Sequence, residues 1–219
     1  METNWAAEQL QTIRTLMERS AVYRRTLAPI MTFNGALGIA GAVLCRVFRV
    51  DTPRGFVILW VVVAAIALAG SFLLVRRQAL KEAEPFWSPP TRRVALAMLP
   101  ALAVGLFVAV LTVCGSSDGA GDAGVVALIW CVLYGLALHA AGFFMPRGIR
   151  LLGWLFIFAG CGFALALLLT TRDGAGGGHG SPLDPLFDGR GLFMGIMFGG
   201  LHLAYGTYLY FTEKGKNAS

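Results

Sequence analysis

GLFMGIMFGGLHLAYGTYLYF, residues 191–211, identifies the chain as a membrane protein more directly than any other segment. An apolar run of about 20 residues is long enough to cross the hydrocarbon core of a bilayer as a helix. Gly191, Gly195 and Gly199 recur every four residues, and Gly206 follows seven residues later, so one face of the predicted helix is nearly bare backbone. Helices approach closely in lipid where small residues line the contact. We therefore predict that another helix packs on this glycine face.

The composition of the whole chain agrees with this segment. Of its 219 residues, 57% are hydrophobic and only 14% are charged, and the mean hydropathy is +0.69. A soluble domain of this length cannot bury so large an apolar fraction. The formal net charge of +6 does not indicate a nucleic-acid surface, because the basic residues cluster at the ends of apolar runs. We expect the lipid bilayer as the surrounding medium and no nucleic-acid partner.

The apolar runs predict an all-α membrane domain over residues 26–211, a bundle of six helices. Each run is close to the length that a membrane-spanning helix requires. The predicted spans cover residues 27–45, 56–75, 94–114, 123–145, 151–169 and 192–211. Residues 212–219 form a short tail after the last span.

The basic residues predict the orientation of the bundle. Counted on alternate sides of the six predicted spans, 13 of the 18 Lys and Arg residues fall on the side of the two termini and 5 on the other. Positively charged loops remain in the cytoplasm. We therefore expect both termini to be cytoplasmic.

This orientation is testable with fusion proteins. Alkaline phosphatase fused after Gly121, in a loop without any Lys or Arg, is expected to be active. The same enzyme fused after Pro89, in an arginine-rich loop, is expected to be inactive. The reverse pattern of activity would overturn the orientation.

Residues 1–25 have the pattern of an amphipathic helix. Leu10, Ile13 and Met17 recur at helical spacing, while Glu8 and Glu18 lie on other faces. Arginines gather at its C-terminal end, where the helix dipole favours positive charge. We expect this helix to lie in the membrane interface or to bind a partner.

The cysteines and the known catalytic motifs give no enzyme class. The four cysteines lie in or at the ends of apolar runs and form no CxxC pair, so free thiols are expected, with a Cys45–Cys114 disulfide as the alternative. The chain has no P-loop and no HExxH motif. The GxSxG pattern at residues 115–119 suggests a rhomboid-like protease, but Ser117 would lie at the membrane surface, far from His202. We expect no catalytic residue.

Polar residues within the spans are the candidates for a functional site. Such residues are costly in lipid and face the interior of a bundle. His202 comes three residues after Gly199, so we expect it on the glycine face and pointing into protein. The possible intramembrane polar site comprises Asn34, Tyr134, His139, His202 and Tyr205. These groups either hold helices together by hydrogen bonds or form a ligand or proton-relay site, and the first interpretation is favoured.

A metal or haem site is a weaker interpretation of the histidines. His139 and His202 lie at unequal depths, whereas two axial haem ligands must match. His179 and three nearby aspartates lie in a glycine-rich loop, which does not provide a preorganised metal site. We expect no cofactor and no metal.

Three segments carry a resemblance to a known group. IRTLMERSAVYRR at residues 13–25, LYGLALHAAGFFMPRGIRLLGW at 133–154 and FGGLHLAYG at 198–206 resemble uncharacterised small bacterial multi-span membrane proteins. The genes of that group often neighbour those of PadR-like transcription regulators. The resemblance implies a bacterial inner-membrane location and no particular chemistry. In layout alone, the chain is similar to ABC-2 type permeases.

Together, these patterns favour a sensory, regulatory or scaffolding membrane protein over an enzyme. We expect it to act through a protein partner or as a homo-oligomer. The alternative is an ABC-2-like permease subunit that works with a separate ATPase.

Overall fold

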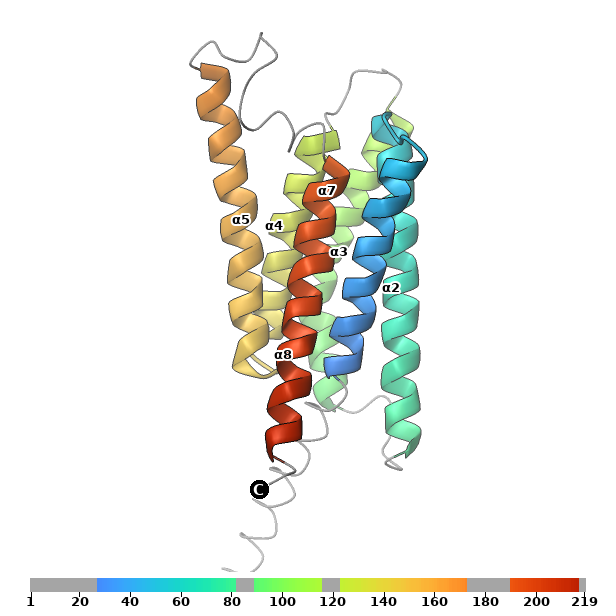
Figure 1. Cartoon of the computed structure of the whole chain (residues 1–219), viewed down its shortest axis with the longest axis vertical. Coiled ribbons are helices and arrows are strands. Elements are labelled where there is room, and N and C mark those ends of the chain that lie inside the picture. The colour runs from blue at the N-terminus through green and yellow to red at the C-terminus, as the bar shows by residue number, and fades with distance from the viewer. Residues whose placement is uncertain (1–26, 82–88, 116–122, 173–189, 217–219) are drawn as a thin grey trace, which may run out of the picture.

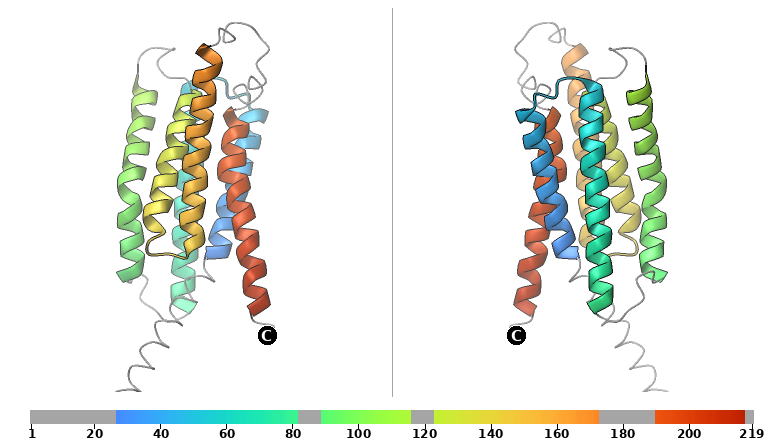
Figure 2. Two further views of the ribbon diagram at one scale, coloured as in Figure 1. Left: turned by 90° about the vertical axis from the view of Figure 1, so that its left-hand side faces the viewer. Right: turned by 90° about the vertical axis from the view of Figure 1, so that its right-hand side faces the viewer.

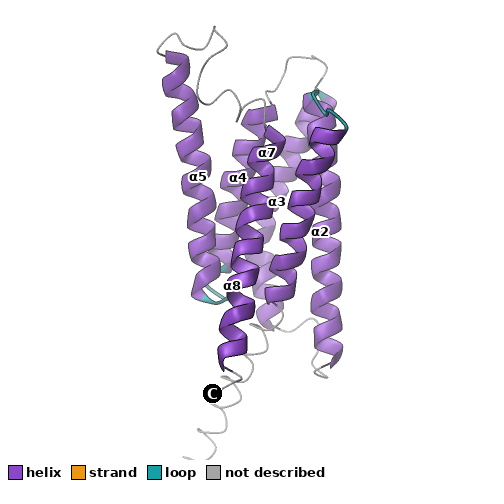
Figure 3. Ribbon diagram, viewed as in Figure 1, coloured by secondary structure: helices purple, strands orange, loops and turns teal. Residues whose placement is uncertain are grey.

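The computed structural model describes residues 27–81, 89–115, 123–172 and 190–216, and every regular element in these ranges is a helix (Figures 1 and 3). Within these ranges, six helices are long and apolar enough to cross a membrane, which confirms the all-α six-span class. The first is Leu27–Val47, called the first helix below. The others are α2 (Pro53–Lys81), α3 (Pro89–Cys114), α4 (Ala123–Ala141), α5 (Arg147–Arg172) and a last helix formed by α7 (Arg190–Met194), η2 (Gly195–Gly200) and α8 (Leu201–Lys216). The predicted amphipathic helix at 1–25 lies outside the described residues.

The six helices run roughly alongside one another (Figures 1 and 2). The first and last helices lie together on one side of the bundle, and α3 lies on the opposite side (Figure 2). α4 and α5 are neighbours along the chain and pack together. The ends of α2, α4 and the last helix lie toward the same end of the bundle as the labelled C-terminus (Figure 1). This arrangement fits an even number of spans, which returns the chain to the side on which it began.

The observed helix ends differ from the predicted span boundaries, mostly where polar residues follow an apolar run. Most helices extend past the apolar runs into charged residues, and α2 continues to Lys81. α4 instead ends at Ala141, four residues before the predicted boundary at Met145. Pro146 prevents the helix from continuing past this region, because proline cannot donate a helical hydrogen bond and disfavours helical conformation in Met145 before it. The chain turns there and re-enters the bundle as α5.

A Schellman motif ends the first helix. Val50 N–H donates to the Cys45 carbonyl at 3.0 Å, and Arg49 N–H donates to the Arg46 carbonyl at 3.3 Å. Arg49 takes the left-handed conformation that this motif requires, with φ of 47°. Val50 then packs against the buried core. The motif satisfies terminal carbonyls and directs the chain toward α2.

The glycines of the last helix lie against the first helix. A methyl group at Gly199 would lie 2.8 Å from the backbone nitrogen of Ile39, and one at Gly38 would lie 2.6 Å from the backbone nitrogen of Gly199. The backbones are therefore in direct contact at this point. The same close approach occurs along the interface, with Gly191 against Cys45, Gly195 against Ala42 and Gly206 against Thr32. A glycine on at least one of the two facing helices allows them to approach so closely.

Two arginines connect loops at the end of the bundle opposite the C-terminus. Arg190 donates to the carbonyl of Asp51 at 2.8 Å. Arg54 donates to the carbonyl of Gly115, at the end of α3. The first hydrogen bond joins the last helix to the short connection between the first helix and α2, and the second joins the start of α2 to the end of α3. These arginines therefore have a structural role in holding the helix ends together.

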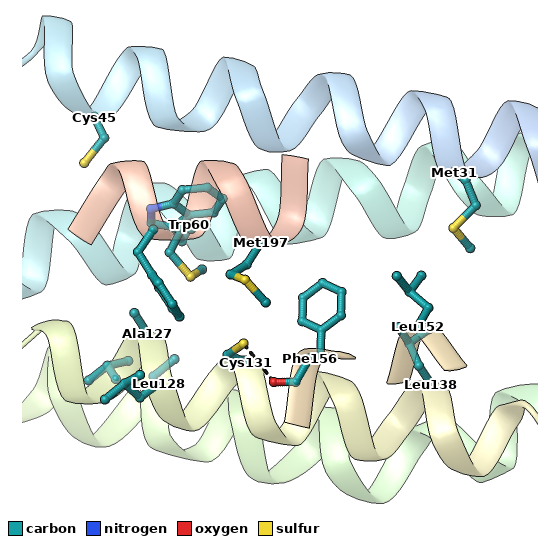
Figure 4. Packing of buried hydrophobic residues seen from close by; sticks show 14 of the residues in the cluster. Met31, Cys45, Trp60, Ala127, Leu128, Cys131, Leu138, Leu152, Phe156 and Met197 are labelled. Atoms are coloured by element: carbon teal, nitrogen blue, oxygen red, sulfur yellow. Dashed lines mark hydrogen bonds between the residues drawn. The ribbon is translucent and has the colours of Figure 1, made fainter. Parts of the chain in front are cut away.

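All four cysteines are free thiols, and the alternative Cys45–Cys114 disulfide is absent. Cys45 is buried beside Gly191, whereas Cys114 is exposed at the end of α3. The buried Cys131 of α4 donates to the carbonyl of Phe156 in α5 at 3.3 Å (Figure 4). The thiol thus contributes to the contact between α4 and α5.

Burial is uneven among the helices. Within the apolar window of each span, 44% of residues are buried in α4 and in the last helix, but only 11% in α2 and 6% in α3. α3 exposes large side chains such as Leu99, Leu106 and Phe107. In a bilayer, these residues face lipid or another protein. The core therefore lies between the first helix, the last helix, α4 and α5, with α2 and α3 at its margin.

Candidate functional site

The most deeply buried polar side chain of the described residues belongs to the last helix. His202 is 1% exposed, and its Nε2 atom lies 2.7 Å from the hydroxyl oxygen of Tyr134 in α4. A neutral phenol has one proton to donate, so Nε2 is assigned as the acceptor and Nδ1 carries the ring proton. The bond joins α4 to the last helix across the middle of the bundle.

Aromatic rings surround this pair. Phe156 of α5 meets Tyr134 edge-on at 5.1 Å and His202 at 5.6 Å between ring centroids. Phe198, one turn before His202, lies 5.1 Å from the rings of both Tyr134 and Phe156. Trp60 of α2 extends the cluster with a ring 6.4 Å from that of Phe198. We refer to Tyr134, Phe156, Phe198 and His202 as the aromatic cluster.

Nδ1 of His202 has no hydrogen bond of good geometry within the described part of the chain. The nearby main-chain acceptor is the Phe198 carbonyl, four residues earlier. An Nδ1–H directed toward that carbonyl agrees with the tautomer assigned above. A buried donor without a well-formed bond costs free energy, typically about 1–3 kcal/mol. The ring is therefore held by its bond to Tyr134 and by packing.

The backbone is irregular immediately before His202. Gly195–Gly200 is a π-helical segment, in which the Leu201 N–H donates to the Ile196 carbonyl, five residues back. Such segments are rare and occur frequently at functional sites. Glycines at positions 195, 199 and 200 give this segment unusual backbone freedom. The wider turn changes the direction in which the following side chains leave the helix.

The position of His202 differs from the expectation of a face shared with the glycines. Three residues of an ideal α-helix turn by about 300°, so His202 already lies about 60° from Gly199. In the structure, Gly199 contacts the first helix, whereas His202 contacts α4 and α5. The last helix therefore uses one side for backbone contact and another for the aromatic cluster.

The other predicted polar residues lie apart from this pair. Asn34 accepts a hydrogen bond from the Ser71 hydroxyl of α2 at 3.2 Å. His139 packs between aromatic rings, 5.0 Å from Trp154 and 5.5 Å from Phe143. Its buried Nδ1 has no partner in the described ranges.

Tyr205 is the remaining member of the predicted site, and it also lies elsewhere. It packs over Gly148 near the start of α5 and stacks on Tyr208. Of the five predicted residues, the structure therefore brings together only Tyr134 and His202. Each of the other three takes part in a separate contact between helices.

Sequence reasoning missed the two phenylalanines of the cluster. Phe156 and Phe198 stand among many apolar residues, and nothing in the sequence distinguishes them from lipid-facing ones. Phe158, two residues after Phe156, is 65% exposed, whereas Phe156 is fully buried. The only signal that could have found Phe198 is its position one turn before a histidine within a glycine-rich segment.

The described residues contain no group of three or more His, Cys, Asp or Glu side chains that could hold a metal ion. The loop residues of the weaker metal hypothesis, around His179, and Ser117 of the GxSxG pattern lie outside the described ranges. The geometry at His202 is that of a hydrogen-bonded pair in an apolar environment. Such a pair fixes the relative position of two helices, because separating them would leave two buried polar groups unpaired.

Comparison of the chain with protein-family models, with curated proteins and with solved structures finds no match.

Proposed function

We propose that this multi-pass protein acts as a sensory, regulatory or scaffolding component of a bacterial inner membrane, by binding a partner and not by catalysing a reaction. The observation that carries the proposal is that Tyr134 and His202 are hydrogen-bonded to each other inside the bundle. The two side chains satisfy each other at 2.7 Å and are enclosed by Phe156 and Phe198. A catalytic histidine must instead reach a substrate. A paired, enclosed histidine is suited to holding a defined arrangement of helices.

The exposed helices support a role in binding. α2 and α3 cross the full span but bury little of their surface within the chain. The outer face of α3 exposes Phe107 and Leu111, with the small Ala103 exposed one turn before Phe107. Small residues between large ones favour helix association in lipid. We infer that a protein partner or a second copy of the chain docks on this margin of the bundle.

Photocrosslinking in native membranes tests the proposal. Benzoylphenylalanine replaces Phe107 of α3 in one variant and Phe158 of α5 in another. Both residues are exposed to similar extents, 61% and 65%. A discrete protein adduct at position 107, with only lipid adducts at position 158, is the expected result. Lipid adducts alone at both positions would contradict the proposal.

The identity of the adduct separates this function from the permease alternative. A crosslink between two copies of the chain, or to a membrane protein without nucleotide-binding motifs, supports a regulatory or scaffolding role. Copurification of a P-loop ATPase would instead favour a transporter subunit, because this chain contains no P-loop of its own. Both termini are proposed to be cytoplasmic, where such an ATPase would bind.

A further inference from the structure

A groove opens between α5 and the last helix. It has a volume of about 630 Å³ and lies between the first half of α5 and the second half of the last helix. This volume is within the range of roughly 300–1,000 Å³ that is typical of ligand sites. The groove is distinct from the aromatic cluster, since neither Tyr134 nor His202 lines it. It is open on one side, and both helices belong to the membrane-spanning set.

The lining changes from polar to apolar along the groove. On α5 it runs from Arg147 through Leu151 to Leu155, in steps of one turn. On the antiparallel last helix it runs from Thr212 through Tyr208 to Leu201. At 1.5 Å per residue these stretches cover about 12 and 16 Å. The groove therefore extends through about half of a hydrocarbon core of roughly 30 Å, which is the depth of one leaflet.

The polar end carries a positive charge. Arg147 is exposed and has no hydrogen bond or ion pair with any other side chain whose position the structure describes. Tyr205 and Tyr208 stack on each other and also line the groove, and tyrosine is enriched at the boundary between lipid and water. Arg147 is also the first residue of a 26-residue helix, whose N-terminus favours a negative charge. The arrangement matches an anionic headgroup next to an acyl chain.

We propose that this groove binds one anionic phospholipid, with an acyl chain between α5 and the last helix and its phosphate at Arg147. The Leu residues provide the apolar contact, and the guanidinium provides charge-assisted hydrogen bonds to phosphate. This inference is independent of the proposed function, since it concerns a different site. It predicts that one lipid remains with the protein after the surrounding lipids are removed.

Native mass spectrometry of the full chain in neutral detergent tests the site. Phosphatidylglycerol, phosphatidylcholine and inorganic phosphate are titrated separately. Phosphatidylglycerol is expected to bind with a stoichiometry of one, more tightly than phosphatidylcholine, and phosphate is expected not to bind. Arg147→Gln is expected to weaken phosphatidylglycerol binding about tenfold, because it removes the charge-assisted hydrogen bonds to the phosphate.

A second variant tests the apolar part of the groove. Ala204 lines it and is exposed, so Ala204→Phe fills the space without displacing a buried group. This variant is expected to lose phosphatidylglycerol binding, and its thermal unfolding without lipid verifies that it is folded. Ala204→Leu replaces it if it does not fold. Arg77→Gln on α2 is the matched control, since it removes an exposed arginine that does not line the groove.

Three results would overturn the proposal. The first is equal binding of phosphatidylglycerol by the folded Ala204 variant and the unmodified protein. The second is an equal loss of affinity in Arg77→Gln and Arg147→Gln. The third is binding of inorganic phosphate that competes with the lipid, which would indicate an anion site without a role for the acyl chain.

Discussion

Gly199→Leu is expected to lower the unfolding temperature of the detergent-solubilised protein by several degrees. A methyl group at this position would already lie 2.6 Å from Cγ1 and 2.8 Å from the backbone nitrogen of Ile39. A side-chain rotation cannot relieve the contact with backbone, so the first and last helices must separate. Overpacking typically costs about 1–3 kcal/mol, and separation of the helices places Gly199→Leu at the upper end of this range. At about 2–4 °C per kcal/mol for a chain of this size, the expected shift is roughly 6–12 °C.

The adjacent glycine provides the control. No heavy atom lies within 4 Å of a methyl group placed at Gly200, so Gly200→Leu adds the same side chain in open space. Its unfolding temperature is expected to be close to that of the unmodified protein. Gly38→Leu, on the first helix, is expected to resemble Gly199→Leu, because a methyl group there meets the backbone of Gly199. Equal stability of Gly199→Leu and Gly200→Leu would refute the close contact between these helices.

Tyr134→Phe is expected to destabilise the bundle although it removes only one oxygen atom. The substitution leaves Nε2 of His202, a residue 1% exposed, without its donor. An unsatisfied buried acceptor costs about 1–3 kcal/mol. Tyr210→Phe is the matched control, because Tyr210 is 60% exposed in the same last helix and its substitution should have little effect. Thermal or denaturant unfolding in detergent measures both.

The double variant separates the hydrogen bond from packing. His202→Leu alone leaves the Tyr134 hydroxyl unpaired and also removes part of a buried ring. In Tyr134→Phe combined with His202→Leu, neither polar group remains, so the loss should be smaller than the sum of the two single losses. Coupling energies between buried polar groups in membrane proteins average about 0.6 kcal/mol and reach about 1.7 kcal/mol. Strictly additive losses would show that the 2.7 Å contact contributes nothing to stability.

The polar residues show where prediction from sequence ended. Asn34, His139 and Tyr205 share with His202 the property of being polar within an apolar run, and the sequence alone treats them alike. Their partners are Ser71 for Asn34, Trp154 for His139 and Gly148 for Tyr205. Ser71 lies on α2, whereas Trp154 and Gly148 lie on α5, so each of the three residues contacts a helix other than its own. Depth along a helix follows from counting residues, but the direction of a side chain around the bundle depends on how the helices pack.

The sequence by itself determined the helical class, the number of spans and the glycine face of the last helix. These properties follow from local rules. In lipid, the backbone N–H and C=O groups of a span must form hydrogen bonds within the helix, and an apolar run must be long enough to cross the hydrocarbon core. The tertiary structure alone decided that the first helix covers those glycines, that Tyr134 meets His202 and that α5 and α8 leave a groove between them. Such contacts join residues far apart in the chain, and η2 redirects the side chains that follow it. The periodicity of one helix does not specify how that helix is rotated about its own axis relative to a neighbouring helix.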